Sequence, residues 1–599
     1  MSEKKIRIGC SSGFWGDTET AAPQLVRGGN IDYLVNDYLA EITMSIMAGM
    51  RLKKPDSGYA TDFVTHVMAP LAREIAEKKI KVITNAGGVN PLACRDAVLK
   101  AAAAAGVTLK VAAVLGDDLA PRADELRAAG IVELDSAETL PKSLVSMNAY
   151  LGGLPIARAL AEGADVVITG RSVDSALVLG ALIHEFGWKV DDYDRLAMGS
   201  LAGHIVECGA QCNGGNFTDW QLVPDFDNIG FPIAEVDSDG NFTISKPPGT
   251  GGLITPATVG EQMLYEIGDP RAYMLPDVTC DFTRVKMEQT AKDVVRVSGA
   301  RGLPPSSTYK TSGTYVDGFK LTAVFMIGGI EAAKKGTHIA EAIVKRTRRM
   351  FRERNLGDYK EVTIEAIGAE TTYGPHAHAG SREVVMKIAA KHDQKEALTI
   401  LGREIAPMGT GGVPGMTGFL GGGRATPGPL IRLFSCLVPK NMVPVTVDID
   451  GKRIDVTIPA EGGFSPDMLP ADAAPKPETV AGDAVAVPLV ALAYGRSGDK
   501  GDSCNIGIIA RKPEYLPIIA AQVTEASVAQ FMAHRVKGMV SRWALPGIGG
   551  FNFLLRNALG GGGVASLQTD PQGKAYAQML LDMPIQVPAA LARGLPKAA

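Results

Sequence analysis

One short segment, residues 203–219, gathers side chains that could carry out acid–base or nucleophilic chemistry. It reads GHIVECGAQCNGGNFTD. His204 and Glu207 are three residues apart, so on a helix they share a face and could form an acid–base pair. Cys208 follows directly, and a thiol beside glycine-rich backbone is a common setting for a catalytic nucleophile. We therefore predict that His204, Glu207 and Cys208 are the catalytic residues.

Two other interpretations of this segment stay open. Cys208 and Cys212 are four residues apart and, with His204, could form part of a zinc site. The chain has no second cysteine pair, although His376 and His378 could be argued to take that role. Cysteine and histidine also fill protein cores without binding anything, which would make the segment a structural cap. No metal ligand is predicted.

Glycine-rich and polar loops follow the apolar runs of the chain. A turn at the carboxyl end of a strand exposes backbone N–H groups that can hold a phosphate or a carboxylate. Arg171 adds a bidentate cation for the same anions, unless it forms an ion pair with Asp174. Each loop could also be a turn without a ligand, since neither GxGxxG nor GxxxxGK[ST] is present. The predicted substrate-binding residues are Ser11, Ser12, Gly13, Asn85, Gly87, Gly88, Asn90, Arg171, Asp174, Asn213 and Asn216.

The elements that must position these loops alternate along the first two hundred residues. Short apolar runs, rich in β-branched residues, are separated by stretches with helical periodicity; the runs are Ile6–Cys10, Ile80–Thr84, Leu109–Leu115 and Asp165–Thr169. Such alternation predicts βαβ units and a parallel or mixed sheet with flanking helices. In sheets of this kind ligands bind beyond the carboxyl ends of the strands, where the loops lie.

Composition changes divide the chain into three parts. Residues 1–459 form the predicted large α/β core domain, and its end, VTVDIDGKRIDVTI, is typical of a hairpin around Asp450-Gly451. Residues 460–484 are rich in Pro, Ala and Gly without hydrophobic periodicity, which indicates a linker. Residues 485–599 are long enough for a small α+β domain. Its polar loop, residues 494–507, is either a ligand site or a subunit contact.

Charge and cysteine content exclude several classes of partner. The chain has 61 Lys and Arg against 65 Asp and Glu, a net charge of −4 over 599 residues, which offers no footprint for nucleic acid or an anionic membrane. Seven cysteines, an odd number in so long a chain, do not form a disulfide framework and suit a reducing compartment. We expect a cytoplasmic homo-oligomer that acts on a small molecule.

Several motifs in order give the chain a family resemblance. They are IGCSSGFWGD, VITNAGGVNP, TGRSVDSALVL, GHIVECGAQCNGGNFTDW and YGRSGDKGDSCNIGIIAR. Together they resemble the acyclic terpene utilisation family, AtuA, over nearly the whole chain. The resemblance implies that the C-terminal domain is ferredoxin-like. It also implies a place in citronellol and geraniol breakdown, where a branched acyl-CoA is oxidised, carboxylated and hydrated before a two-carbon unit is removed.

Three hypotheses for function follow. The leading one is an acyl-CoA enzyme of acyclic terpene or branched-chain acid catabolism, a lyase or hydratase on a 3-hydroxy-3-methylglutaryl-like CoA thioester. Coenzyme A would enter as part of the substrate, and a divalent metal, which often assists such a cleavage, stays open. The second is a non-catalytic partner subunit of an acyl-CoA carboxylase assembly. The third is a nucleotide-dependent ligase or kinase that uses Ser11–Gly16 as a phosphate cradle.

Overall fold

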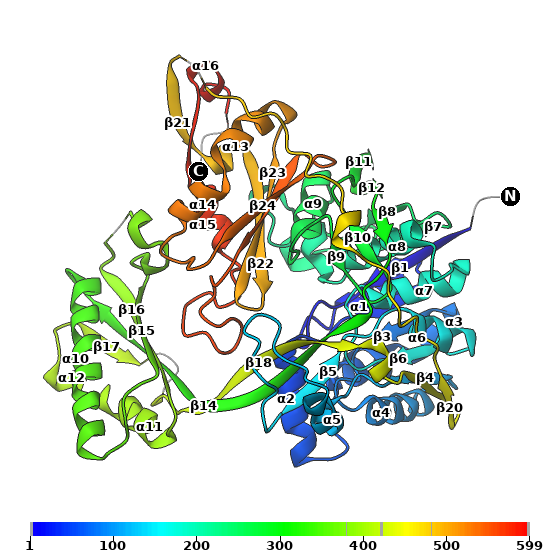
Figure 1. The fold of residues 1–599 in the computed structure, drawn as a ribbon, viewed down its shortest axis with the longest axis horizontal. Helices are drawn as coiled ribbons and strands as arrows, with labels where there is room; N and C mark the ends of the chain where they lie inside the picture. The colour runs from blue at the N-terminus through cyan, green and yellow to red at the C-terminus, as the bar shows by residue number, and fades with distance from the viewer. Residues whose placement is uncertain (1–3, 379, 420–422, 481, 596–599) are drawn as a thin grey trace.

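A mixed sheet forms the centre of the computed structural model, which describes residues 4–378, 380–419, 423–480 and 482–595 (Figure 1). Its strand order is β11-β12-β8-β7-β1-β2-β3-β6-β4-β19-β20. The middle strands β1, β2, β3, β6 and β4 run parallel to one another. They span Lys5–Cys10, Tyr33–Asn36, Lys81–Thr84, Val166–Ile168 and Val111–Leu115. The predicted parallel strands are therefore confirmed, and their carboxyl ends meet at one edge.

Antiparallel strands extend the sheet on both sides. β7, β8, β12 and β11 continue it beyond β1, and β19 and β20 continue it beyond β4. The hairpin β19–β20 turns at Asp450 and Gly451, both with positive φ, as expected for a two-residue type I′ turn. The flanking strands span Ile233–Asp237, Phe242–Ser245, Val294–Ser298, Lys286–Ala291, Thr446–Ile449 and Lys452–Asp455.

Helices cover both faces of this sheet, because its middle strands are apolar on both sides. Tyr33 and Val35 of β2 belong to one core, and Leu34 between them belongs to the other. Helices α6, α7, α8 and α9 pack on the first core, and α1, α2, α3 and α4 pack on the second. Their bounds are Leu154–Ala161, Ala176–Phe186, Tyr193–Val206, Pro256–Leu264, Ala21–Gly28, Glu41–Lys53, Ala69–Lys78 and Pro91–Ala104, and the short α5 spans Ala123–Ala128.

Two long strands lead from this domain into a separate lobe, residues 319–427 (Figure 1). β14 (Thr308–Gly328) pairs with β18 (Gly428–Pro439) and, near its start, with β5 (Ser146–Ala149). The far half of β14 joins β15, β16 and β17 in the lobe, whose core is separate from those of the main sheet. The remaining lobe elements are β15 Glu361–Ile367, β16 Glu383–His392, β17 Met416–Phe419, α10 Ala332–Glu353, α11 Lys395–Glu404 and α12 Met408–Gly411.

The C-terminal domain is an antiparallel sheet in the order β22-β23-β25-β24, with its own core. These strands span Ala493–Lys500, Ser503–Ala510, Gly550–Leu555 and Val540–Leu545. β21 (Ala484–Pro488) and β26 (Pro584–Pro588) pair beside it. Its helices are α13 Leu516–Gln522, α14 Glu525–Phe531, α15 Tyr576–Leu581 and α16 Ala589–Ala592. This arrangement confirms the predicted fold class, an α/β domain followed by a smaller α+β domain.

The predicted linker contacts both domains that it joins. The N–H of Phe464 donates to the carbonyl of Pro305, 3.2 Å away, and the N–H of Glu478 donates to the carbonyl of Pro517, 3.1 Å away. A small sheet beside α8, of β9 (Tyr273–Met274), β10 (Thr279–Asp281) and β13 (Arg301–Leu303), completes the fold. Throughout the part of the chain that the structure describes, every helix is too short or too polar to cross a membrane.

Candidate functional site

The carboxyl edge of the parallel strands collects the loops that carry the predicted motifs. The loop after β1 lies against the end of α8, where a Cβ on Gly13 would come within 3.0 Å of the Cys208 backbone. Asn85, after β3, accepts a hydrogen bond from the N–H of Tyr38, after β2, at 2.8 Å. The loop after β1 thus contacts the end of α8, and the loops after β2 and β3 contact each other, at the sheet edge where ligands are expected to bind.

The C-terminal domain docks on this side through a pair of buried asparagines. Asn505 donates to the carbonyl of Leu264 at 2.6 Å and accepts from the N–H of Glu266 at 2.9 Å. Asn552 accepts from Asn505 at 3.0 Å and donates to the carbonyl of Gly268 at 2.6 Å. Both side chains are fully buried. The pair thus holds the turn after α9, residues 264–268, by its backbone groups.

Two glycines of the C-terminal motif let the turn approach this closely. A Cβ on Gly507 would lie 2.4 Å from the Cβ of Leu264, and one on Gly498 would lie 2.6 Å from the Tyr265 ring. Glu266 in the turn has a φ of 58°, a conformation that costs energy for a residue with a side chain. The docked domain therefore fixes Glu266 in a conformation that it would not adopt by preference.

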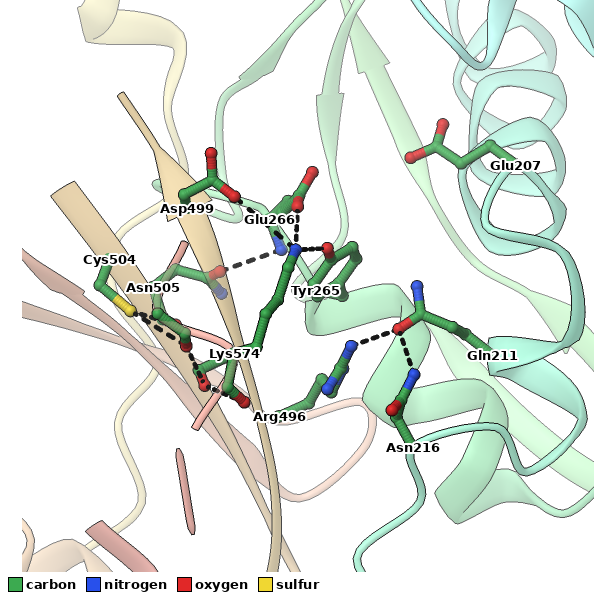
Figure 2. Close-up of polar contacts among 12 residues, drawn as sticks. Glu207, Gln211, Asn216, Tyr265, Glu266, Arg496, Asp499, Cys504, Asn505 and Lys574 are labelled. Atoms are coloured by element: carbon green, nitrogen blue, oxygen red, sulfur yellow. Dashed lines mark hydrogen bonds and ion pairs between the residues drawn. The ribbon is translucent and has the colours of Figure 1, made fainter. Parts of the chain in front are cut away.

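Docking creates a cluster of polar side chains, which we call the interface cluster: Tyr265, Glu266, Asp499 and Lys574 (Figure 2). The Lys574 amine donates to the Tyr265 hydroxyl and, at 2.9 Å, to the Glu266 carboxylate. The Asp499 carboxylate lies 3.7 Å from the same amine. Lys574 and Asp499 come from the C-terminal domain and the other two from the first domain, so the cluster exists only at the interface.

Burial shifts the pKa values of the carboxyl groups and the amine of this cluster towards neutral pH. Desolvation raises the pKa of Glu266 to about 7, against the opposing charge of Lys500. Desolvation and the charge of Glu266 raise the pKa of Asp499 to about 8. Desolvation also lowers the pKa of Lys574 to about 8. Groups that titrate near the working pH can both give and take protons, which suits general acid–base catalysis.

Glu207 extends from the end of α8 towards the interface cluster (Figure 2). Its side chain is 9% exposed. Burial, with the charges of Asp174 and Glu266, raises its pKa well above the usual range. A carboxyl group with such a pKa holds its proton at neutral pH and can donate it.

His204 is a buried neighbour of Glu207. Its Nε2 lies 3.0 Å from the carbonyl of Met263, an acceptor, so Nε2 carries the proton. Its Nδ1 lies 3.2 Å from a Glu207 carboxylate oxygen. The ring is fully buried against Tyr273 and Phe282, and desolvation lowers its pKa to about 4. The neutral ring presents an acceptor to the protonated Glu207, which is a positioning role.

The cysteines of the motif lie in surroundings that keep them as thiols. Cys208 is partly buried, and desolvation with the charge of Glu207 raises its pKa well above the usual value. Cys212 is buried, and desolvation raises its pKa as well. A raised pKa lowers nucleophilicity at neutral pH. Among the residues that the structure describes, no three His, Cys, Asp or Glu side chains are grouped closely enough to hold a metal ion.

The loop after β3 is occupied by contacts within the chain. Asn85 donates to the Asp37 carboxylate at 2.6 Å, and Asn90 donates to the carbonyls of the 55–57 loop. A Cβ on Gly87 would lie 2.4 Å from the Thr169 carbonyl, and one on Gly88 would lie 2.3 Å from a Met47 sulfur. These residues hold loops together, and their predicted contact with substrate stays a prediction.

Arg171 and Asp174 form the ion pair that was the alternative to anion binding, at 3.0 Å. The guanidinium is buried, donates to the Leu39 carbonyl and lies 4.2 Å from the centre of the Tyr150 ring. The Tyr150 hydroxyl donates to Glu41 of α2. Arg171 thus links the loops after β2 and β6, while the charge of Asp174 raises the pKa values of the buried carboxyl groups nearby.

Ser11 and Ser12 line a cavity of about 280 Å³ on the outer side of the β1 loop. Asp17, Glu19 and Asp62 line the same cavity. The loop's own Gly13 N–H already donates to Asp17 at 2.9 Å. Carboxylates repel a phosphate, so this lining disfavours the phosphate cradle that a nucleotide-dependent enzyme needs.

The asparagines after α8 have separate roles. Asn213 is fully buried and donates to the Gly230 carbonyl at 2.6 Å. Asn216 is exposed, with a φ of 60°, and donates to the Gln211 side chain at 3.3 Å. Gln211 also accepts a hydrogen bond from Arg496 of the C-terminal domain (Figure 2). Asn216 is therefore part of the interface, and Asn213 supports the fold.

Comparison with known proteins assigns both domains. Residues 6–449 match the model of the acyclic terpene utilisation family protein AtuA. The chain belongs to the AtuA family. Residues 487–586 match the AtuA ferredoxin-like domain, which confirms the resemblance that the motifs gave. No curated protein and no solved structure matches the chain significantly.

Sequence reasoning missed several residues of this AtuA interface. Glu266 and Lys574 stand in segments without a recognisable motif. Within the first domain, Asp37, which accepts from Asn85, was also missed, because it follows a strand that was not predicted. Asp499 and Lys500 lie in the C-terminal motif that was left open between a ligand site and a contact. One pattern in the sequence could have pointed to Asp499 and Lys500. Their motif places two aspartates and a lysine beside glycines, in a small domain that must dock on another part of the chain.

The AtuA interface predicts a measurable pH dependence of stability through Glu261. Its carboxylate accepts from the Thr218 hydroxyl at 2.6 Å, and burial raises its pKa from 4.5 to about 8. Between these values the folded protein binds a proton that the unfolded chain has lost, so stability falls as pH rises from 4.5 to 8. We expect Glu261→Gln to remove part of this fall, on the order of 1.4 kcal/mol per pKa unit.

Urea unfolding at intervals between pH 5 and pH 8 measures this effect. Glu138→Gln, at an exposed position away from the interface, is the control and should follow the wild-type curve. Identical pH dependence in wild type and Glu261→Gln would contradict the assignment of the titration to Glu261.

Proposed function

We propose that this AtuA protein is an enzyme that transfers protons on a branched acyl-CoA thioester, as a lyase or hydratase on a 3-hydroxy-3-methylglutaryl-like substrate. Membership of a family of acyclic terpene utilisation supports the substrate class. The observation that carries the proposal is Glu207, a buried carboxyl group with a raised pKa that extends towards the interface cluster. Both reactions need a proton donor and a proton acceptor at the same carbon skeleton.

The groups around Glu207 divide these roles in a chemically consistent way. Glu207 keeps its proton at neutral pH and can protonate a departing hydroxyl group in a hydratase. Glu266, with a pKa of about 7, is ionised in part and can accept a proton from the tertiary hydroxyl in a retro-aldol cleavage. One site could therefore serve either reaction, and the substrate decides which.

An exposed cation next to these carboxyl groups supports an anionic substrate. Lys500 is exposed, and its amine lies 5.9 Å from the centre of the Tyr273 ring. Its charge opposes the raised pKa of Glu207 and of Glu266, which places it in their electrostatic neighbourhood. A glutaryl-type acid carries a free carboxylate at the end remote from the thioester, and this carboxylate would pair with Lys500.

The alternative, a non-catalytic partner of an acyl-CoA carboxylase, has less support. An appended domain that recruits a partner needs an accessible face. Here the ferredoxin-like domain uses its β22–β23 face on its own chain, where Asn505 and Gly507 meet the turn after α9. The acid–base groups at that contact would have no role in a purely structural partner.

Mass spectrometry of the protein incubated with branched 3-hydroxyglutaryl- and enoyl-CoA thioesters tests the proposal. Release of acetyl-CoA or acetate would identify a lyase, and gain or loss of water would identify a hydratase. Heat-inactivated protein is the control. If no thioester in the panel changes, the proposal is wrong, and co-purification with carboxylase subunits becomes the next experiment.

A further inference from the structure

Lys574 differs from the other lysines around it in how its amine is surrounded. Its side chain is 37% exposed, so it is partly shielded from solvent. The amine lies 4.4 Å from the centre of the Tyr265 ring, donates to the Tyr265 hydroxyl, and faces the carboxylates of Glu266 and Asp499. One hydroxyl group and two carboxyl groups, contributed by both domains, thus surround this amine.

The backbone around Lys574 is fixed from two directions. Asp570 accepts hydrogen bonds from the N–H groups of Lys574 and Ala575, both at 2.8 Å. Thr569, the residue before Asp570, is held by Glu365 of the lobe. The Glu365 carboxylate accepts hydrogen bonds from the Thr569 N–H at 3.0 Å and from the Thr569 hydroxyl at 2.8 Å. Contacts with the lobe therefore fix the segment that carries the amine, as a reactive group requires.

We propose that Lys574 is a nucleophilic amine that forms an imine with the ketone of a 3-oxo acid. The amine nitrogen attacks the carbonyl carbon, and a new C–N bond forms as the carbonyl π electrons move to oxygen. A protonated carboxyl of Asp499 or Glu266 gives its proton to that oxygen. The carbinolamine then loses water, and the nitrogen proton returns to the carboxylate. One water leaves, and nothing is oxidised or reduced.

The ionisation of the cluster supports this chemistry. Only the neutral amine attacks a carbonyl group, and burial lowers the pKa of Lys574 from 10.5 to about 8. This lowering raises the neutral fraction at pH 7 by roughly 300-fold over an ordinary lysine. The raised pKa of Asp499, about 8, keeps a proton available for the departing oxygen at the same pH.

The choice of a 3-oxo acid as the substrate rests on the proposed function and on one neighbouring residue, Lys500. Retro-aldol cleavage of a 3-hydroxy-3-methylglutaryl thioester leaves a 3-oxo acid, which carries both a ketone and a carboxylate. Lys500, exposed beside the cluster, would pair with the carboxylate while Lys574 engages the ketone. A thioester carbonyl does not form an imine, so this activity goes beyond thioester turnover.

Reductive trapping on the full-length protein tests the proposal. The protein is incubated with acetoacetate and sodium cyanoborohydride, which reduces iminium ions faster than ketones, and is then digested and mapped by mass spectrometry. We expect Lys574 to carry the reduced adduct, or its decarboxylated form, at least 10-fold above the exposed Lys537. Lys574→Arg, which keeps the positive charge, should abolish this adduct, and Lys537→Arg should leave it unchanged.

Each result has one meaning. Labelling of Lys574 no stronger than that of Lys537 would overturn the proposal. Thioester turnover without an adduct at Lys574 would overturn this inference alone and leave the proposed function in place. An adduct at Lys574 without turnover of any thioester would support the inference and count against the lyase or hydratase.

Discussion

Replacing Glu207 by Gln is expected to lower kcat on the responsive thioester about 10²- to 10⁴-fold, the range that general acid–base groups contribute. The amide keeps the size of the side chain and can still contact His204 Nδ1, 3.2 Å from the present carboxyl oxygen. It cannot transfer a proton in the pH range of catalysis. KM should change little, because the lost interaction acts in the transition state. Steady-state kinetics of the purified variant measure both constants.

Asp194→Asn is the matched control for this variant. Asp194 lies in the first turn of the same helix, α8, where it is exposed and pairs with Arg301 at 2.7 Å. The substitution removes a carboxylate from the helix without changing the interface. The kcat of the Asp194→Asn variant should therefore stay within twofold of wild type. Wild-type turnover by Glu207→Gln would remove Glu207 from the mechanism.

Replacing Asn505 by Leu is expected to lower the free energy of unfolding by about 2–6 kcal/mol and to lower activity with it. The change leaves the Leu264 carbonyl and the Glu266 N–H buried without partners, and each such group costs about 1–3 kcal/mol. Glu266 would also lose the contact that holds its φ at 58°. Urea unfolding and the rate of proteolysis in residues 460–484 measure the loosened docking.

Asn228→Leu is the control that separates the loss of the Asn505 docking contacts from the effect of an Asn→Leu substitution on stability in general. Asn228 is exposed and makes a side-chain bond of 3.3 Å to the Gly249 carbonyl, so its replacement should change stability by less than about 0.5 kcal/mol. Equal unfolding curves for the two variants would mean that the asparagine pair does not carry the docking of the ferredoxin-like domain.

The parallel core was predictable because its signal is local. Strands buried on both faces must be largely apolar, and residues 80–84 and 109–115 show this in the sequence, with a lysine only at the second position of each run. β2, Tyr33–Asn36, was not recognised, although it is no shorter than the predicted β3 and β6, and so Asp37 after it was missed. The lobe was missed because of the way its strands pair. Its strands pair with the far half of β14, and nothing in the sequence shows that one strand pairs with β5 near its start and with lobe strands near its end.

The candidate site was predicted in part. His204 and Glu207 were expected to share a helix face, and they lie in contact there, but their protonation states are not those of a simple acid–base pair. Full burial makes His204 a neutral support and leaves the proton on Glu207. The three-residue spacing places His204 and Glu207 on one helix face, whereas burial sets their protonation states. Burial in turn depends on which residues of other segments pack against the helix.

The sequence by itself determined the family, the fold class and the loops at one sheet edge, because motifs, periodicity and strand-end glycines are properties of neighbouring residues. Only the tertiary structure decided that Glu266 meets Lys574, residues 308 positions apart. It also decided their ionisation, since the pKa values of both groups depend on the water that the docked domain excludes. Desolvation is a property of the assembled interface, and no stretch of sequence encodes it alone.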